Sequence, residues 1–142
     1  MLIGIPAILG PELLSILRAM GHGDEIAIVD GNYPAQEHAR RLIRADGHGV
    51  VPVLDAILQV IPVDDFVPEA LFRATVKNNP DKLDPVHGDM VAVCEKLAPG
   101  RQIVPLPGEV FYDRIKAAYA IVATSEPRLY GNIVIRKGVI YP

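Results

Sequence analysis

Glu25-Ile26-Ala27-Ile28-Val29-Asp30 is a short run whose four central residues are all apolar. A strand with one face in water alternates apolar and polar residues, whereas a strand that is covered on both faces does not. The run therefore predicts a buried strand, in a sheet that carries helices on both sides.

Strands and helices alternate along the rest of the chain. Pro11–Gly21 has the helical pattern, because its leucines share one face, its proline fits the first turn and its final glycine supplies a stop. The other helices are expected at residues 50–61, 84–97 and 109–118, with one helical turn at 34–39, and the other strands at 41–45, 70–76, 101–106, 119–124 and 132–137. No helix separates the last two strands, so the order predicts an α/β fold with a mixed sheet, in a single domain spanning residues 1–142.

The composition is that of an ordinary globular protein and excludes several classes. The 142 residues are 50% hydrophobic and 22% charged, with a formal net charge of −3. Such a chain has no general attraction to nucleic acid or anionic lipid, and no apolar run approaches the ~18 residues of a membrane span. The first residues lack the basic start of a signal peptide, so we expect a cytoplasmic protein with no nucleic-acid and no membrane partner.

His22 lies between Gly21 and Gly23, where the first predicted helix gives way to the first strand. An imidazole titrates near neutral pH and can give and take protons, so His22 is a candidate for general acid–base catalysis. The alternative interpretation is a histidine that stabilises the carboxyl end of the helix through the helix dipole.

Polar residues also stand at the ends of predicted strands, where ligands bind in open α/β sheets. Asp30 follows the first strand and its carboxylate suits sugar hydroxyls, although an Asx-turn also explains the residue. Tyr130 and Asn132 enter the last strand, and in an extended chain both side chains would emerge on one face, with Gly131 leaving room between them. A phenol beside a carboxamide suits a sugar ring, and ordinary strand-entry residues look the same in sequence.

No other motif carries a specific chemistry. His38, His48 and His87 do not have the spacing of metal ligands, and no dinucleotide fingerprint, P-loop or serine-hydrolase motif occurs. The single cysteine, Cys94, cannot form an internal disulfide and fits a core position on a helix. We therefore expect neither a metal nor another cofactor.

Four motifs, in order along the chain, resemble the RbsD/FucU family of ribose pyranases and fucose mutarotases. They are Met20-Gly21-His22-Gly23-Asp24-Glu25-Ile26, Arg44-Ala45-Asp46-Gly47, Phe111-Tyr112-Asp113-Arg114, and Tyr130-Gly131-Asn132 followed by Lys137-Gly138-Val139. The resemblance runs from residue 3 to residue 139. The first three motifs are closer to the fucose mutarotase branch than to the ribose pyranase branch.

The resemblance implies a cytoplasmic enzyme without a cofactor that interconverts the cyclic forms of a monosaccharide such as L-fucose. It also implies a three-layer α/β/α sandwich and a ring-like homo-oligomer, often a decamer, with sites near subunit contacts. His22 matches the catalytic histidine of the family and Asp30 its sugar-binding carboxylate. Tyr130, Gly131 and Asn132 match its carboxyl-terminal sugar-binding segment.

One position departs from the family pattern. Gly108, followed by Glu109, stands where members commonly carry an arginine or histidine that reaches the sugar. This departure leaves open which sugar is bound. It also supports an alternative in which the chain binds a monosaccharide without turning it over, as an accessory to transport or regulation. A further alternative is a structural protein whose apolar surfaces serve assembly alone.

Overall fold

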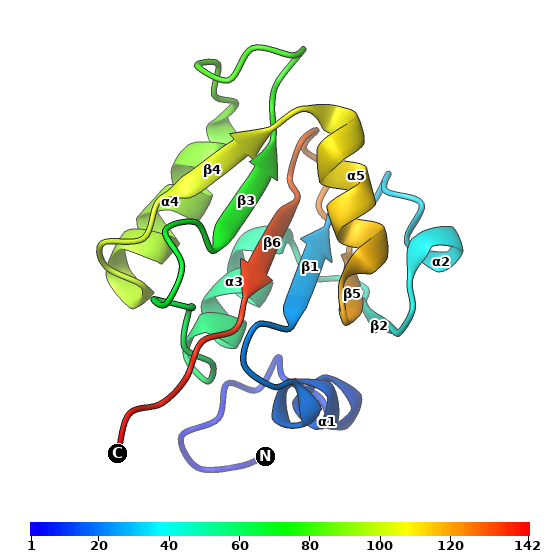
Figure 1. Ribbon diagram of the computed structural model, residues 1–142. Helices are drawn as coiled ribbons and strands as arrows, with labels where there is room; N and C mark the ends of the chain where they lie inside the picture. The colour runs from blue at the N-terminus through cyan, green and yellow to red at the C-terminus, as the bar shows by residue number, and fades with distance from the viewer.

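The apolar run at residues 25–30 forms strand β1 (Glu25–Val29) of a six-stranded sheet in the computed structural model, which describes residues 1–142 (Figure 1). The strand order is β2-β5-β1-β6-β3-β4. The other strands are β2 (Leu42–Ala45), β3 (Leu71–Ala74), β4 (Ile103–Leu106), β5 (Ala120–Thr124) and β6 (Ile133–Arg136). β6 is antiparallel to both its neighbours, β1 and β3, whereas the remaining pairs are parallel, so the expected mixed sheet is confirmed.

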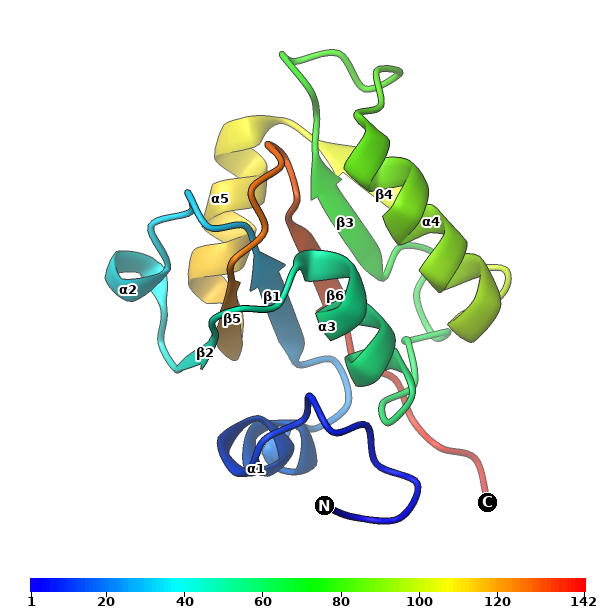
Figure 2. The same cartoon turned by 180° about the vertical axis from the view of Figure 1, so that it is seen from behind.

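The helices form a layer on each face of this sheet (Figures 1 and 2). They are α1 (Pro11–Ala19), α2 (Ala35–His38), α3 (Val50–Leu58), α4 (Pro85–Leu97) and α5 (Gly108–Ala117). α1, α3 and α4 pack on one face, and α2 and α5 on the other. The expected three-layer α/β/α sandwich is therefore confirmed.

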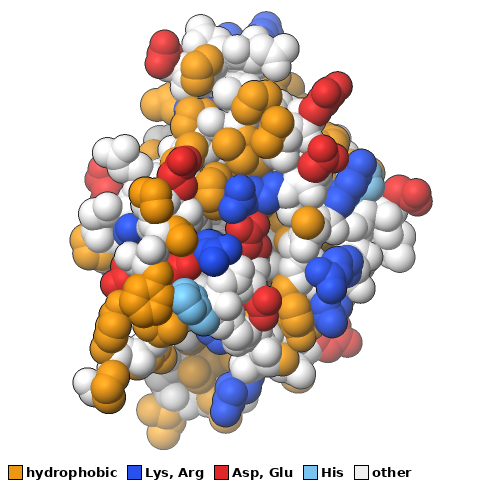
Figure 3. Space-filling model, in the orientation of Figure 1, with side chains coloured by type: hydrophobic (Ala, Val, Ile, Leu, Met, Phe, Trp, Pro, Cys, Tyr) orange, Lys and Arg blue, Asp and Glu red, His pale blue; other side chains and the backbone are white.

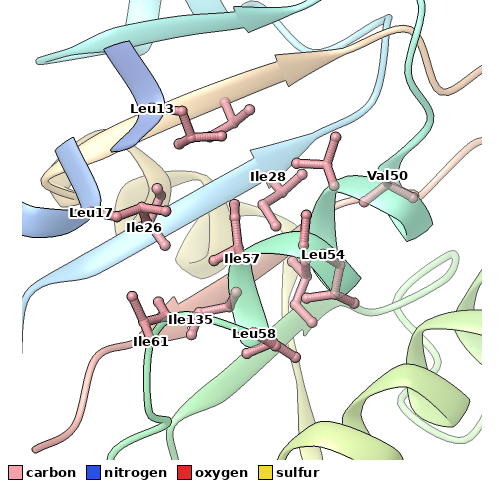
Figure 4. Close-up of a cluster of buried hydrophobic side chains, with 14 of the residues drawn as sticks. Leu13, Leu17, Ile26, Ile28, Val50, Leu54, Ile57, Leu58, Ile61 and Ile135 are labelled. Atoms are coloured by element: carbon pink, nitrogen blue, oxygen red, sulfur yellow. The ribbon is translucent and has the colours of Figure 1, made fainter. Parts of the chain in front are cut away.

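Strand β1 has no alternation of polar and apolar residues because both of its faces are buried. Ile26 and Ile28 pack into a cluster of 22 buried residues beneath α1, α3 and α4 (Figure 4). Ala27 and Val29 pack into a second cluster of 12 residues against α2 and α5. Full burial of a large aliphatic side chain contributes about 1.5–3 kcal/mol, so a polar residue at any of these positions would destabilise one of the two layers.

The parallel strands place functional groups at two opposite edges of the sheet. β1, β2, β3, β4 and β5 all end at one edge, and the segment that leads into β6 begins there. The segments that precede β1 and β3, and the carboxyl end of β6, lie at the other edge. None of the helices is both long and apolar enough to span a bilayer.

Candidate active site

A cavity of about 990 Å³ opens at the carboxyl ends of the parallel strands. The segments that line it follow β1, β3 and β4 or precede β6, and helix α5 adds further residues along its length. Asp30, Tyr130 and Asn132, which the sequence singles out, all line this cavity. Its position agrees with the general preference of ligands for the carboxyl ends of strands in α/β sheets.

Asp30 and Asn132 form a reciprocal hydrogen-bonded pair at the cavity. The backbone N–H of Asp30 donates to Asn132 Oδ1 at 2.8 Å, and Asn132 Nδ2 donates to Asp30 Oδ2 at 2.9 Å. Asp30 Oδ1 accepts from the N–H of Asn32 at 2.9 Å, so the residue also forms the Asx-turn that the alternative predicts. Both side chains are buried and held in place, and each oxygen keeps a second lone pair with which a ligand hydroxyl can bond.

Tyr130 lines the cavity, but its backbone is not in the extended conformation that the sequence predicts. Its φ is 61°, in the left-handed region, and β6 begins only at Ile133. The assumption that Tyr130 and Asn132 lie in extended chain was therefore wrong, because a turn precedes the strand. Gly131 does not line the cavity. A Cβ at that position would lie 2.8 Å from Glu126 Cγ, so glycine is needed there for close packing.

Two tyrosines that the sequence did not mark as ligands also line the cavity. The rings of Tyr33 and Tyr112 lie 5.0 Å apart between centroids, and the Tyr33 hydroxyl is 2.7 Å from His38 Nδ1. Burial, and to a lesser degree Tyr112, raises the pKa of Tyr33, so its phenol stays neutral. Aromatic rings with a polar edge suit the apolar face of a sugar. Only the fold brings the end of β1 and helix α5 together, so no local pattern could reveal this pair.

Gly108 and Glu109 line the cavity at the start of α5. No heavy atom lies within 4 Å of the place that a Cβ on Gly108 would occupy. The cavity is therefore open at the point where the resemblance leads one to expect an arginine or histidine. Lys77, from the segment after β3, and Lys116, from the last turn of α5, also line it and supply the cationic groups at this site.

His22 lies at the opposite edge of the sheet. It precedes β1 whereas Asp30 follows it, and a strand of five residues separates the two positions by ~16 Å. The His22 ring packs edge-on against Phe66, with 4.9 Å between centroids, and lines a separate cavity of about 530 Å³. Figure 3 shows hydrophobic side chains gathered beside a histidine on the face of Figure 1, towards the lower left.

Asp64 holds the His22 imidazole in place. His22 Nε2 lies 3.0 Å from Asp64 Oδ1, and Arg136 Nε donates to Asp64 Oδ2 at 2.7 Å. Burial tends to raise the pKa of Asp64, but hydrogen bonds from Arg136, from the N–H of Phe66 and from His22 outweigh it and hold the pKa at about 2. An ionised carboxylate can only accept hydrogen bonds. His22 Nε2 therefore carries a hydrogen, and Nδ1 is the nitrogen left to exchange a proton.

The structure does not support the interpretation of His22 as a helix-end residue. The carbonyls of Leu17, in the last turn of α1, and of Met20, its C-cap residue, accept hydrogen bonds from Lys137 Nζ at 3.0 and 2.6 Å. These carbonyls already have a cationic partner, and His22 turns instead towards the carboxylate of Asp64.

Within one chain, the residues predicted for the site lie in two places. Asp30, Tyr130 and Asn132 meet at one cavity, and His22 lies at the far end of β1. Asp64 was missed because it is 42 positions from its partner His22 and no motif links them. No group of three or more His, Cys, Asp or Glu side chains is arranged to hold a metal ion.

Comparison with known proteins assigns the chain to a family. Residues 3–140 match the model of the RbsD / FucU transport protein family. This chain belongs to the RbsD/FucU family. The resemblance carried by the four motifs is thereby confirmed. Among RbsD/FucU relatives, the fucose mutarotase of Homo sapiens is 39% identical over 143 aligned positions, which cover 96% of this chain and 93% of that protein.

Solved structures of related proteins share the fold of this chain over nearly its whole length. The fucose mutarotase from Streptococcus pneumoniae, solved in complex with L-fucose, has a TM-score of 0.90 and 40% identity, and the match covers 99% of this chain and 100% of that one. Bacillus subtilis RbsD complexed with D-ribose has a TM-score of 0.73 and 23% identity, with coverage of 94% and 95%. At that identity RbsD shows a shared fold alone.

Proposed function

We propose that this chain is a monosaccharide mutarotase, an isomerase that interconverts the cyclic forms of L-fucose by general acid–base catalysis without a cofactor. One observation carries the proposal. The cavity lined by Asp30, Tyr130 and Asn132 occurs in a chain that is 40% identical, over 99% of its length, to a fucose mutarotase solved with L-fucose. The proposal places the enzyme in the cytoplasm, with a monosaccharide and not a nucleic acid or a membrane as its partner.

The chemistry requires few special groups. One proton is delivered to the ring oxygen while another leaves the anomeric hydroxyl, so that the bond between the anomeric carbon and the ring oxygen breaks and a carbonyl forms. Rotation about the bond to the released aldehyde, followed by the reverse proton transfers, closes the other anomer. Because this reaction already proceeds in water, positioned acid–base groups that accelerate it ~10²–10⁴-fold are sufficient.

In this proposal His22 delivers the proton to the ring oxygen from Nδ1, because Asp64 engages Nε2. Asp30 and Asn132 bind sugar hydroxyls, and Tyr130 adds a phenol at the same cavity. The turn at Gly131 lets these groups approach one another. The base that accepts the anomeric proton is a water or Asp30 itself.

The separation of His22 from the cavity is explained if a second copy of the chain supplies the histidine. Exposed apolar side chains lie both at the rim of the cavity and on the surface near His22. Those at the rim of the cavity are Val110, Tyr112 and Leu129. Those near His22 are Phe66, Ile140 and Tyr141. Because the two surfaces differ, their contact is heterologous, and repeated heterologous contacts that close produce a ring. The proposed assembly is therefore a ring-like homo-oligomer with sites at subunit contacts, and the family resemblance suggests a decamer.

Saturation-exchange NMR between α- and β-L-fucose tests the proposed activity. We expect the wild-type protein to accelerate the exchange, and His22→Ala to lose ~10²-fold or more of that acceleration. His48→Ala is the matched control, because His48 is exposed and lies outside both cavities. An unchanged rate in His22→Ala removes the proposed role of His22.

The same experiment, run on several sugars, distinguishes an enzyme from a protein that binds a sugar without turning it over. It also shows which sugar is the substrate of a chain that has glycine at position 108. D-ribose, D-galactose and L-rhamnose are measured beside L-fucose, with binding followed by calorimetry. A sugar that binds without faster anomer exchange establishes the non-catalytic alternative. Faster exchange of one sugar over the others identifies the substrate.

A further inference from the structure

The backbone at the cavity contains all the left-handed residues of the chain that are not glycine. Lys77, Asn78 and Tyr130 have φ values of 49°, 60° and 61°, and all three line the cavity. A side chain disfavours this conformation, and such residues persist only where the surroundings hold them. The strained backbone of Tyr130 therefore needs groups that hold it in place.

His87 forms a hydrogen bond with the backbone of Tyr130. Its side chain is fully buried in the first turn of α4, and its Nε2 lies 3.1 Å from the carbonyl oxygen of Tyr130. Its other nitrogen, Nδ1, accepts from the backbone N–H of Asp84 at 3.1 Å. Because a backbone N–H can only donate, Nδ1 carries a lone pair, and Nε2–H donates to the carbonyl.

The surroundings keep this single tautomer in place. Burial lowers the pKa of His87 by more than the hydrogen bond with the Tyr130 carbonyl raises it. The charges of Arg73, which lowers the pKa, and of Asp84, which raises it, have smaller effects. The imidazole is therefore neutral near pH 7. A second proton would have to sit on Nδ1, where it would face the N–H of Asp84.

Arg73 supports the opposite side of the same cavity. Its buried guanidinium donates to the carbonyls of Ala74 and Pro80 at 3.0 and 3.1 Å, and so anchors the loop that carries Lys77 and Asn78. The N–H of Lys77 lies 3.4 Å from the Tyr130 hydroxyl. Tyr130 thus joins the two sides, held through its carbonyl by His87 and through its hydroxyl by the loop.

We propose that His87 is a positioning residue for the sugar site, and that its Nε2–H holds Tyr130 in the left-handed conformation that brings the phenol to the cavity beside Asn132. This inference rests on the proposed function. Capping of α4 explains only the Nδ1 contact, because the Nε2 contact reaches a residue 43 positions away.

Two substitutions separate the positioning role from the capping role. Gln and Asn both offer an oxygen that can accept from the N–H of Asp84. Only Gln is long enough to place an N–H where His87 Nε2 lies. His87→Gln therefore keeps both contacts, whereas His87→Asn keeps the cap and loses the bond to Tyr130.

We expect His87→Asn to raise the KM for L-fucose about fivefold to tenfold, with kcat close to wild type, because the proton transfers belong to other groups. His87→Gln restores the wild-type KM. Thermal unfolding of both variants checks that they are folded. A wild-type KM in folded His87→Asn, or equal KM values above wild type in both variants, overturns the inference.

A measurement on the wild-type protein keeps the inference testable if His87→Asn does not fold. Nitrogen-15 NMR is expected to show His87 as the Nε2–H tautomer near pH 7, and L-fucose is expected to shift that signal because its bonding partner is Tyr130. A signal that saturating L-fucose leaves unchanged overturns the inference. Failure of the proposed function is distinguishable, because in that case the wild-type protein does not accelerate anomer exchange at all.

Discussion

The carboxylate of Asp64 determines which nitrogen of His22 is free. In Asp64→Asn the amide can donate as well as accept, so it no longer fixes the His22 tautomer. We expect the acceleration of L-fucose anomer exchange to fall about 10- to 100-fold, because only part of the imidazole population then presents Nδ1 correctly. Saturation-exchange NMR measures the rate, and nitrogen-15 shifts of His22 report the tautomer.

Asp65→Asn is the matched control for this change. Asp65 is the next residue along the chain, is exposed, and accepts a hydrogen bond from the Tyr141 hydroxyl at 2.9 Å. It makes no hydrogen bond with the imidazole, so neutralising it should leave the rate and the His22 tautomer unchanged. A wild-type rate in folded Asp64→Asn would show that orientation by this carboxylate is not needed.

The sequence alone identifies some of the candidate site residues and not others. His22 between two glycines and Asp30 at a strand end stand out, because their local setting is unusual for their chemistry. Asp64 does not stand out, because it matters only through a contact with a histidine 42 positions away. Tyr33 and Tyr112 are similar cases, since their ring contact depends on the packing of α5 against the sheet.

At the scale of helices and strands, periodicity and breakers predicted the elements to within a few residues. Helix α3 shows the limit, because it ends at Leu58 instead of at Ile61, just before Pro62. The mixed sheet followed from the missing helix between the last two strands. The strand order did not, because β6 inserts between β1 and β3 through contacts that are distant in sequence.

The amino end of α3 depends on a residue from another element. Its N-cap, Gly49, has no side chain, and the N–H of Val50 donates to Glu126 Oε2 at 3.2 Å. Glu126 is buried in the segment after β5, where Arg128 Nε donates to its Oε1 at 2.7 Å. Glu126 therefore ties the helix to the loop that leads to Tyr130.

Glu126→Gln should destabilise the protein by about 1–3 kcal/mol, because it weakens charge-assisted hydrogen bonds in a buried setting. Hydrogen bonds from Arg128 hold the pKa of Glu126 below the usual value of a glutamate. Its stabilising contribution is therefore complete above about pH 4.5 and is lost as the pH falls through the lowered value. Urea unfolding between pH 3 and pH 7 should show a flatter pH dependence in the variant.

Asp89→Asn is the control variant for Glu126→Gln. It neutralises the exposed carboxylate that pairs with Arg128 at 2.7 Å, and leaves Glu126 in place. An exposed ion pair contributes about 0–1 kcal/mol, so this variant should remain near the wild-type stability. Equal losses in the two variants would contradict the role of Glu126 as the cap of α3.

At the scale of the whole molecule, the fold places the candidate acid–base residue and the proposed sugar cavity at opposite edges of one sheet. Sequence spacing could not show this, because His22 and Asp30 are only eight positions apart and appear to be neighbours. Strand β1 separates them because its extended residues run from one edge of the sheet to the other. The same strand that determines the fold class therefore requires a contact between copies for the proposed reaction.

Subunit complementation tests this requirement. His22→Ala retains the cavity and lacks the proton donor, whereas Asp30→Asn retains the donor and impairs the cavity, so each homo-oligomer should be nearly inactive. In co-expressed, equally mixed oligomers, a heterologous contact joins an intact His22 to an intact cavity in about a quarter of the sites, so about a quarter of the wild-type exchange rate should return. If each chain used its own histidine, no mixed oligomer would contain an intact site, and activity would stay at the sum of the two inactive variants. Recovery of the expected fraction would establish that the site is shared, whatever the number of subunits in the ring.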